Sequence, residues 1–365
     1  MLPVPVILGD IGGTYARFAV LLDAGPASLP IRRETAADAT PSIAIKAALR
    51  SLEGPKPRSA LLALAGRVDE PAVRLTNAPW IVDAAQIGGD LGLDRVMLVN
   101  DYAPVAAALL KLDQSRTGEL ARIGPPLPPG PGPRLVIGPG TGLGIAALIP
   151  IGQCSLIQTT EAGHVEFGPS DDLEYSIWPF LERVHDRVTA EAALSGPGLV
   201  RLHRALARAR NLVPSCVSPK DVMDKGRSGD DPLASETLRL FARLLGRYAG
   251  DLALTFGATG GVYVAGGIAP RMTDILNGGE FRNAFESKAP FGAVMQRIPA
   301  FVISHPEPAM VGLAALARTP ERFVFEAHGW RAPGKSRAGC IPLSSEEPPS
   351  EALQQSQTRS IEHGA

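Results

Sequence analysis

The chain has 365 residues, of which 45% are hydrophobic, with 36 Lys and Arg against 37 Asp and Glu. This length suggests two domains with a substantial buried core, and the balanced charge favours neither nucleic acid nor an anionic membrane as a partner. No apolar run reaches the ~18 residues that a membrane span needs. Cys154, Cys216 and Cys340 lie too far apart for a C-x-x-C zinc site. With no signal peptide before the first apolar segment, we expect a cytoplasmic protein.

The first unit of the chain is predicted to be strand, glycine loop, strand, over residues 4–8, 9–14 and 17–22. Gly12 and Gly13 allow backbone N–H groups to approach an anion closely, and the Thr14 hydroxyl adds a donor. Asp10, at the end of the strand, is suited to hold Mg²⁺ directly or through water. A plain hairpin turn with Asp10 as a local cap explains this motif equally well when it is taken alone.

Strands alternate with helices in the next hundred residues, which predicts an α/β fold. Helices are expected over 41–52, with Thr40 as N-cap and Pro41 at the first helical position, and from 101 to 112. Strands are expected over 60–65, 73–76 and 95–99. Asn100 and Asp101 follow the last of these strands. They have two interpretations, a helix-capping pair or a general base at the carboxyl end of a strand. The capping interpretation is favoured when the pair is considered in isolation.

A proline-rich connector over 124–133, with six prolines in ten residues, is a plausible domain boundary. After it the opening pattern returns, with strands at 134–137 and 145–149 around a loop with four glycines in residues 138–144. A dinucleotide fingerprint would require a helix after this loop, and we reject it because a strand follows. The repeat predicts two phosphate-binding loops that face each other across a cleft.

The second half is predicted to be more helical, with helices near 172–185, 197–210, 233–256 and 308–318 and a strand at 260–265. Glu161 and His164, on a glycine turn, offer polar groups that can bind vicinal hydroxyls. Glu191 is unremarkable as an isolated helix residue. Residues 329–336 match the pattern G-x-x-x-x-G-K-S, but the sequence that follows cannot hold the helix of a P-loop.

Taken together, these motifs resemble those of the bacterial glucokinases, which belong to the hexokinase-like actin-fold superfamily of sugar kinases. The resemblance runs from about residue 6 to residue 318. It is carried by seven segments in family order: residues 9–14 (GDIGGT), 75–80 (LTNAPW), 99–102 (VNDY), 138–144 (GPGTGLG), 161–167 (EAGHVEF), 194–199 (LSGPGL) and 260–268 (GGVYVAGGI).

The resemblance implies ATP-dependent phosphorylation of D-glucose to glucose 6-phosphate, the entry step of glycolysis. Asp101 would take the proton from the 6-hydroxyl, and the sugar would be bound by Asn100, Asp101, Glu161, His164 and Glu191. The ATP site would consist of Gly9, Asp10, Ile11, Gly12, Gly13, Thr14, Gly140, Thr141, Gly142, Gly266 and Gly267, with Mg²⁺ at Asp10. The family usually acts as a homodimer.

The fold implied is the two-domain actin-like ATPase fold, which is ribonuclease H-like, with a cleft between the domains. The small α/β domain would comprise residues 1–113 and 307–320, and the large one residues 114–306. Residues 321–365, which have no family counterpart and few signs of periodicity, are predicted to be a disordered tail.

Two residues depart from the family pattern. Tyr15 stands where Asn is usual, so we place it outside the site, and Ala162 replaces a glycine, so its turn must avoid positive φ. The chain lacks the cysteine-rich zinc motif of the repressor-and-kinase sugar family. Three rival functions stay open: a kinase for another hexose, a kinase using ADP or polyphosphate, and a non-catalytic sugar sensor. The intact Asp10 and Asp101 argue against the sensor.

Overall fold

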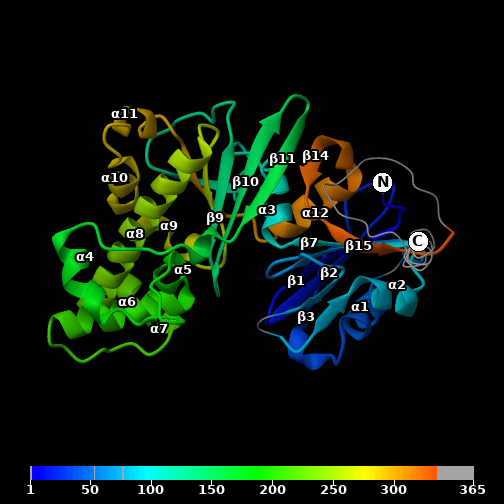
Figure 1. Ribbon diagram of the computed structural model, residues 1–365, viewed down its shortest axis with the longest axis horizontal. Coiled ribbons are helices and arrows are strands. Elements are labelled where there is room, and N and C mark those ends of the chain that lie inside the picture. Colours follow the sequence, from blue (N-terminus) through cyan, green and yellow to red (C-terminus); the bar gives the residue numbers. More distant parts are fainter. Residues whose placement is uncertain (1, 53, 76–77, 335–365) are drawn as a thin grey trace, which may run out of the picture.

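The computed structural model describes residues 2–52, 54–75 and 78–334. Two large sheets stand side by side, and a set of helices flanks the second sheet on its far side (Figure 1). We call the six-stranded sheet with its helices the first lobe and the seven-stranded sheet with its helices the second lobe. Both lobes are mixed α/β, as the sequence predicts.

The sheet of the first lobe has the order β15-β7-β4-β1-β2-β3. Its parallel centre consists of β1 (Val6–Ile11), β4 (Ser59–Leu64) and β7 (Arg95–Asn100). Antiparallel strands flank it, namely β2 (Tyr15–Leu21), β3 (Ile31–Glu34) and β15 (His328–Arg331). The near-continuous apolar runs of β1 and β4 follow from their central position, because both faces of such strands are covered.

Helices cover both faces of this sheet. One face packs on α1 (Pro41–Arg50) and α2 (Ala84–Leu91), and β5 (Ala72–Arg74) with β6 (Ile81–Asp83) forms a small ribbon nearby. The start of α1 is as predicted, since the Thr40 hydroxyl caps the N–H of Ile43 and Pro41 opens the helix. The η1 turn (Thr35–Ala37) lies between β3 and α1, and the N–H of Thr35 donates to the carbonyl of Thr14 in the glycine loop.

The sheet of the second lobe has the order β14-β11-β10-β9-β12-β13-β8. Its strands are β8 (Leu120–Ile123), β9 (Arg134–Pro139), β10 (Leu143–Ile151), β11 (Cys154–Thr160), β12 (Gly261–Val264), β13 (Ala300–Ile303) and β14 (Phe323–Phe325). β9 and β10 form an antiparallel hairpin, as β1 and β2 do in the first lobe. The predicted repeat of strand, loop, strand is therefore confirmed.

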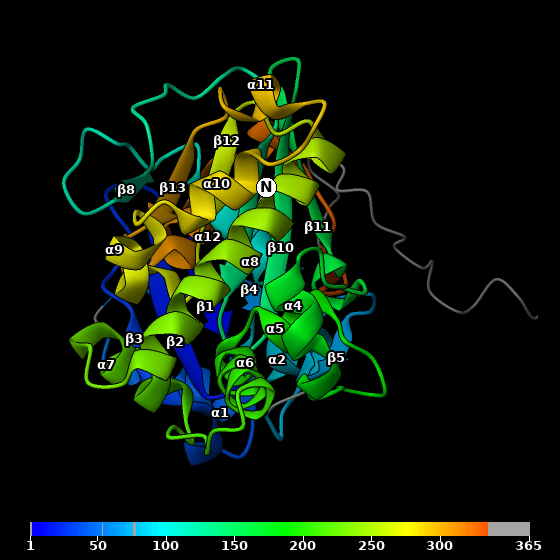
Figure 2. The same cartoon turned by 90° about the vertical axis from the view of Figure 1, so that its left-hand side faces the viewer.

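The helices of the second lobe lie on the side of its sheet that faces away from the first lobe. Figure 2, viewed from that side, shows α6, α8 and α10 in front of the sheet. The helices are α4 (Asp172–Ile177), α5 (Ala190–Ala193), α6 (Gly196–Ala209), α7 (Pro219–Ser228), α8 (Pro232–Phe256), α9 (Thr273–Leu276), α10 (Glu280–Glu286) and α11 (Gly292–Met295). Short turns η2 (Ala162–His164), η3 (Trp178–Phe180), η4 (Ala269–Met272) and η5 (Pro320–Arg322) connect them and the strands.

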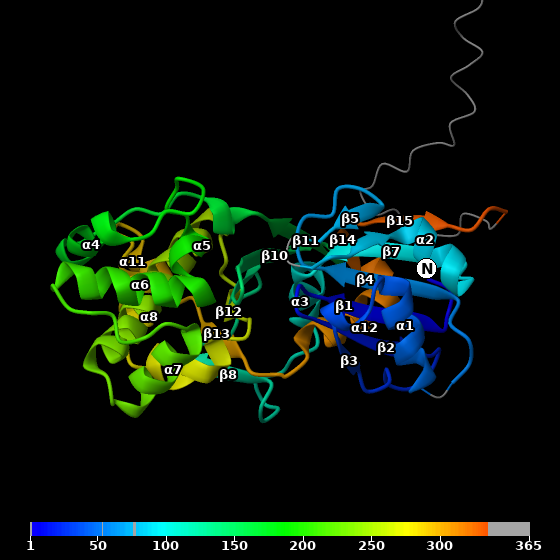
Figure 3. The ribbon, with the colours of Figure 1, turned by 90° about the horizontal axis from the view of Figure 1, so that it is seen from below.

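Two helices join the lobes. α3 (Tyr102–Ala108) and α12 (Pro308–Arg318) pack on each other, and their side chains share one core with residues of both sheets. Seen from below, both helices lie at the junction of the lobes (Figure 3). Because α3 begins directly after β7, the polar residues at its start are held where the two lobes meet. The domain limits given above stay a prediction.

Two expectations about helices and strands were wrong. The helix expected over 172–185 ends at Ile177, and the backbone turns through left-handed conformations at His185 and Asp186. The ordered chain was expected to end at 320, yet η5, β14 and β15 occupy residues 320–331. These strands have three and four residues, too short for periodicity to show, and they are stabilised by pairing with β11 and β7. The rest of the predicted tail, 335–365, lies outside the described residues.

Candidate active site

The first glycine loop closes the hairpin between β1 and β2. The N–H of Gly12 donates to the carbonyl of Tyr15, and the fully buried Thr35 bonds to the carbonyls of Gly12 and Thr14. The side chain of Thr14 is exposed. The aromatic ring of Tyr15 is covered by the guanidinium of Arg32, 3.6 Å from its centroid. Tyr15 is therefore accommodated by the neighbouring strand β3.

Asp10 lies at the carboxyl end of β1, directly opposite Arg17 of β2. Its carboxylate forms an ion pair with the Arg17 guanidinium at 3.0 Å, and the same guanidinium lies 3.1 Å from Glu307, just before α12. Burial raises the pKa of Asp10, and the Arg17 charge opposes this. The sequence analysis missed Arg17, which the β1–β2 hairpin places across from Asp10.

Asn100 and Asp101 have separate structural roles. The Asn100 side chain accepts a hydrogen bond from the N–H of Tyr102 and donates one to the carbonyl of Gly66, so Asn100 supplies the bond to the start of α3. The Asp101 side chain makes no capping hydrogen bond. Its backbone N–H donates to the carbonyl of Leu64 at the end of β4, which fixes its position at the strand ends. Capping is therefore no explanation for the carboxyl group of Asp101.

Asp10, Asp101 and Glu161 each lie at or just after the end of a strand, and the charges of Asp10 and Glu161 act on the Asp101 carboxyl group. The pKa of Asp101 is raised to about 8, first by burial and then by the negative charges of Asp10 and Glu161, against the opposing effect of nearby backbone N–H groups. Like charges that perturb one another in this way are typical of functional sites. The pKa values of Asp101 and Asp10 are thus both raised in this cluster.

Glu161 and His164 flank the short turn η2, which follows β11. Their side chains are half exposed, with 3.8 Å between His164 Nε2 and Glu161 Oε2. Ala162 is not among the residues with positive φ, as its replacement of glycine requires. Gly163 has a packing role, since a Cβ there would lie 2.4 Å from the carbonyl oxygen of Leu143. The turn thus presents two polar side chains and packs tightly against β10.

The second glycine loop contains one glycine with open space beside it. A Cβ added to Gly140 would meet no heavy atom within 4 Å, and Thr141 is exposed. Gly142 is different, because its Cβ would lie 2.5 Å from the Glu191 carboxylate. Glu191 also accepts a hydrogen bond from the N–H of Leu143 at 2.8 Å. Glu191, expected among the sugar ligands, thus contacts the second loop, while its helix α5 also packs against η2.

Gly266 and Gly267 follow β12. Gly266 has φ of 81°, and a Cβ there would lie 2.4 Å from the carbonyl of Pro139 at the start of the second loop. Gly267 is exposed, with no heavy atom within 4 Å of an added Cβ. Gly266 is therefore required by the packing of two backbones, whereas Gly267 leaves room beside the loop.

Helix α8 supports the segment that carries Glu161 and His164. The Tyr248 hydroxyl donates a hydrogen bond to the carbonyl of Ala162 within η2. The ring of Phe167 packs edge-on against Tyr248, and the guanidinium of Arg247 lies over the same ring, 4.0 Å from its centroid. Sequence periodicity identified α8 as a helix but gave no sign of these contacts.

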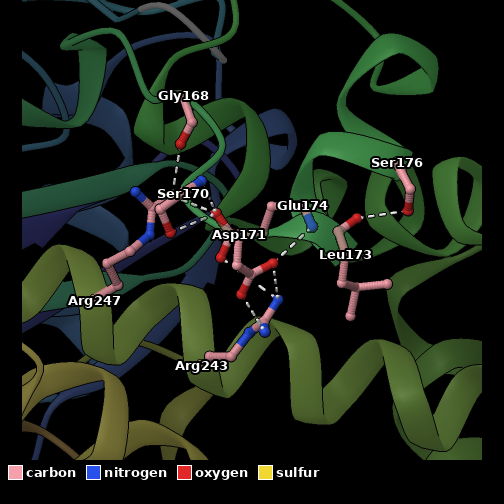
Figure 4. A network of polar contacts seen from close by, with 8 residues as sticks. All are labelled: Gly168, Ser170, Asp171, Leu173, Glu174, Ser176, Arg243 and Arg247. Atoms are coloured by element: carbon pink, nitrogen blue, oxygen red, sulfur yellow. Dashed lines mark hydrogen bonds and ion pairs between the residues drawn. The ribbon is translucent and has the colours of Figure 1, made fainter.

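A buried ion-pair network extends this support (Figure 4). The side chain of Glu174 is 1% exposed and lies 3.1 Å from Arg247 and 3.5 Å from Arg243. Arg243 also pairs with Asp171 at 2.6 Å, and both the N–H and the hydroxyl of Ser170 donate to Glu174. Since buried charges are tolerated only when they are paired, this network fixes the segment after η2 onto α8.

One further cluster brings metal-ligand types together, but hydrogen bonds account for it. His203, Cys216 and Asp231 have potential ligand atoms within 4.8 Å of one another. The His203 ring contacts Thr237 through Nδ1 and accepts from the N–H groups of Ser215 and Cys216 through Nε2. Asp231 caps α8. The cluster thus fastens the loop before α7 to α6 and α8.

The first three residues of the segment that matches the P-loop pattern, 329–331, lie in a strand. Gly329 and Arg331 lie in β15, which pairs with β7, so no phosphate-binding loop begins there. Lys335 and Ser336 lie outside the described residues.

Comparisons with known proteins identify the family of the chain. The family model described as Glucokinase matches residues 7–320. A glucokinase of Brucella suis is 43% identical over 331 residues, which cover 90% of this chain and 95% of that protein. No helix of the described residues is long and apolar enough to cross a bilayer.

Solved structures confirm the fold class. The crystal structure of a glucokinase from an Antarctic psychrotroph has a TM-score of 0.75 and 28% identity, covering 85% of this chain and 97% of that one. A ROK family glucokinase from Streptomyces griseus, solved in complex with glucose and AMPPNP, shares the fold with a TM-score of 0.59 at 22% identity, covering 86% and 99%. The fold is the actin-like ATPase fold. With a family model matched over most of its length and a relative 43% identical over 90% of it, the chain belongs to the glucokinase family.

Proposed function

We propose that the chain transfers the γ-phosphoryl group of ATP to the 6-hydroxyl of D-glucose, with Asp101 as the general base. The observation that carries this proposal is the Asp101 carboxyl group itself. It follows β7, makes no capping hydrogen bond, and has a pKa raised to about 8. A general base works best with a pKa near the working pH, which an ordinary aspartate does not have.

The proposed step is a direct displacement at phosphorus. The glucose 6-oxygen forms a bond to the γ-phosphorus while the bond from that phosphorus to the β,γ-bridging oxygen breaks, and ADP leaves. The proton of the 6-hydroxyl passes to the Asp101 carboxylate. Phosphoryl transfer depends mainly on positioning and charge stabilisation. The two loops and the buried carboxyl group provide fixed points for both reactants.

The residues around the two loops fit a nucleotide and a metal ion. Thr14 and Thr141 are exposed, and Gly140 and Gly267 have open space beside their backbones, so phosphate and adenosine can approach closely. We assign the remaining ATP contacts to Gly9, Asp10, Ile11, Gly12, Gly13, Gly142 and Gly266. Asp10 offers the hard oxygen ligand that Mg²⁺ prefers, directly or through water. The metal would neutralise charge on the phosphates.

The sugar would be bound by Asn100, Glu161, His164 and Glu191 together with Asp101. Support comes from the mutual influence of the Asp101 and Glu161 charges and from the packing of α5 against η2. Hydroxyl groups bound by several convergent polar partners are recognised strictly, because an analogue lacking one leaves a partner unpaired. A panel of hexoses tests whether glucose is preferred over mannose or fructose.

We also propose a homodimer in the cytoplasm. The dimer rests on the family resemblance, and light scattering on the purified chain tests it. The two cysteines within the described residues, Cys154 and Cys216, are free thiols, as expected in a reducing compartment.

The decisive experiment measures glucose-dependent ADP formation in a coupled assay with the full chain. Wild type is compared with Asp101→Asn, which keeps the shape of the side chain but cannot accept the proton. We expect the variant to lose at least about 100-fold in kcat. Asp90→Asn, an exposed position on α2, serves as the control and should behave as wild type. Full activity in Asp101→Asn would refute the base assignment, and glucose binding without turnover in wild type would revive the sensor.

A further inference from the structure

The two outer glycines of the second loop accommodate an aromatic side chain. Gly138 and Gly144 lie directly opposite each other across the β9–β10 hairpin. A Cβ added to Gly138 would lie 1.9 Å from the Tyr102 hydroxyl oxygen, and one added to Gly144 would lie 1.8 Å from Tyr102 Cε2. No side chain larger than hydrogen fits at either position while the ring stays in place. We call Gly138 and Gly144, together with the Tyr102 ring that lies against them, the tyrosine socket.

The socket also contains a hydrogen bond. The Tyr102 hydroxyl donates to the carbonyl oxygen of Gly138 at 2.8 Å. Burial, together with the negative charges of Asp101 and Asp10, raises the pKa of Tyr102 well above its usual value. The hydroxyl therefore remains protonated throughout the neutral range and keeps its role as donor. The ring and its hydroxyl together fasten the start of α3 to the base of the second loop.

Tyr102 is the residue after Asp101 and the first residue of α3. Its backbone N–H is bonded to the Asn100 side chain, so both neighbours of Asp101 are fixed by side-chain contacts. Helix α3 packs on β9, β10 and β11 in the second lobe and on β4 and β7 in the first. The socket thus sets the position of the second loop relative to the Asp101 backbone.

We propose that Tyr102 is a positioning residue that holds the second loop at a fixed place relative to Asp101. This inference rests on the proposed function, in which Asp101 serves the sugar hydroxyl and residues 140–142 hold the phosphates. Transfer between the two requires that acceptor and donor be held in line, and a displacement of about 1 Å can cost 100-fold in rate. Gly138 and Gly144 therefore serve the tyrosine socket, whereas Gly140 has open space beside it for the nucleotide.

Two single variants test the socket at different strengths. Tyr102→Phe removes the hydrogen bond and keeps the ring, so we expect kcat to fall about threefold to tenfold with little change in the KM for glucose. Gly144→Ala forces the ring out of its place, so we expect kcat to fall tenfold or more. A purely structural role would instead lower the thermal midpoint and leave the kcat of the folded fraction unchanged.

A double-mutant cycle shows whether the ring causes the effect. In a Tyr102→Leu background the smaller side chain leaves room for the added methyl group, so Gly144→Ala should cost far less there than in wild type. Gly88→Ala is the matched control, because its Cβ would lie 2.1 Å from the ring of Trp330, and neither Gly88 of α2 nor Trp330 of β15 belongs to a glycine loop. It should lower the thermal midpoint and leave kcat within twofold of wild type.

The outcomes separate this inference from the proposed function. If wild type is active, either of two results would overturn the socket proposal alone. One is full kcat in Tyr102→Phe, and the other is an equal loss of kcat from Gly144→Ala in the wild-type and Tyr102→Leu backgrounds. A wild-type protein with no turnover on any hexose would overturn the proposed function and the socket proposal with it. If Gly144→Ala fails to fold, the kcat of Tyr102→Phe still decides.

Discussion

The carboxylate of Glu191 accepts a hydrogen bond from the backbone N–H of Leu143, with 2.8 Å between the two atoms. Leu143 opens β10 directly after the second loop, so this bond supports the loop that we assign to phosphate. The helix that carries Glu191 packs at the same time against the turn that carries Glu161 and His164. Glu191 therefore lies where it can influence both substrates.

Replacing Glu191 by Ala should weaken the binding of both substrates. The N–H of Leu143 would lose its partner, at a cost of about 1–3 kcal/mol. We expect the KM values for ATP and for glucose each to rise by about tenfold. Glu191→Gln retains an oxygen that can accept the same bond, so its KM for ATP should stay near wild type while that for glucose rises. Initial rates with each substrate varied give these values, with the exposed Glu182→Ala as control. If Glu191→Ala and Glu191→Gln raised the KM for ATP equally, the hydrogen bond from Leu143 to Glu191 would not be what supports the loop.

The acidity of Asp101 predicts the pH dependence of the reaction. Its pKa of about 8 means that the carboxyl group is largely protonated at pH 7 and accepts no proton in that form. We expect kcat/KM for glucose to rise about tenfold per pH unit below pH 8 and to level off above it, because kcat/KM reports the free enzyme. Asp101→Asn should lack this rise. A profile that is flat from pH 6 to 9 would contradict the assignment.

The same shift makes a prediction about stability. The folded Asp101 carboxyl group holds its proton up to about pH 8, whereas the unfolded chain loses it near its ordinary value of about 4. Asp101 therefore makes wild type progressively less stable as the pH rises between these two values. Asp101→Asn cannot ionise, so its thermal midpoint should exceed that of wild type by a few degrees above pH 8. The difference should shrink toward pH 4, as differential scanning fluorimetry can show, and a difference that grows toward acid pH would have the wrong sign.

Much of the fold was predictable because its strongest signals are local. The second hairpin was recognised from its glycines, and α8 was placed over 233–256 against an observed Pro232–Phe256. The cap of α1 at Thr40 was also predicted. By contrast, β11 was missed, because its outer half, with Gln158 and Thr159, is polar and partly exposed. β14 and β15 have no stability without the strands on which they pair.

The candidate site was predictable as a set of motifs but not as a set of contacts. Nothing local indicates that Glu191 meets Leu143, 48 residues earlier, or that Tyr248 meets Ala162, 86 residues earlier. Gly138 and Gly144 were counted as part of the phosphate-binding loop, because a high density of glycines does not show which of them contact a ligand. The predicted strands place these two glycines opposite each other across the hairpin, which indicates that one side chain can contact both.

The hydrogen bond from Tyr248 to Ala162 predicts a selective effect on the sugar. Tyr248→Phe keeps the ring against Phe167 and removes only the hydroxyl. Without this bond the turn η2 is held less firmly, so we expect the KM for glucose to rise about threefold to tenfold, with the KM for ATP unchanged. Steady-state kinetics measure both constants. Tyr175→Phe, exposed on α4, is the matched control. Equal increases in the two KM values would show that the helix supports the whole lobe and not this turn.

The buried carboxylate of Glu174 predicts a large loss of stability. Glu174→Ala leaves Arg247 without its ion-pair partner, although Arg243 keeps Asp171. Removing one member of a buried pair costs about 3–5 kcal/mol, because the remaining charge is left uncompensated. Urea denaturation should therefore show a markedly lower midpoint, and the KM for glucose should rise because residues 165–174 hold the Glu161–His164 turn in place. Asp224→Ala breaks an exposed pair with Lys220 and should cost less than about 1 kcal/mol. A midpoint for Glu174→Ala as high as that of Asp224→Ala would mean that the network contributes nothing to stability.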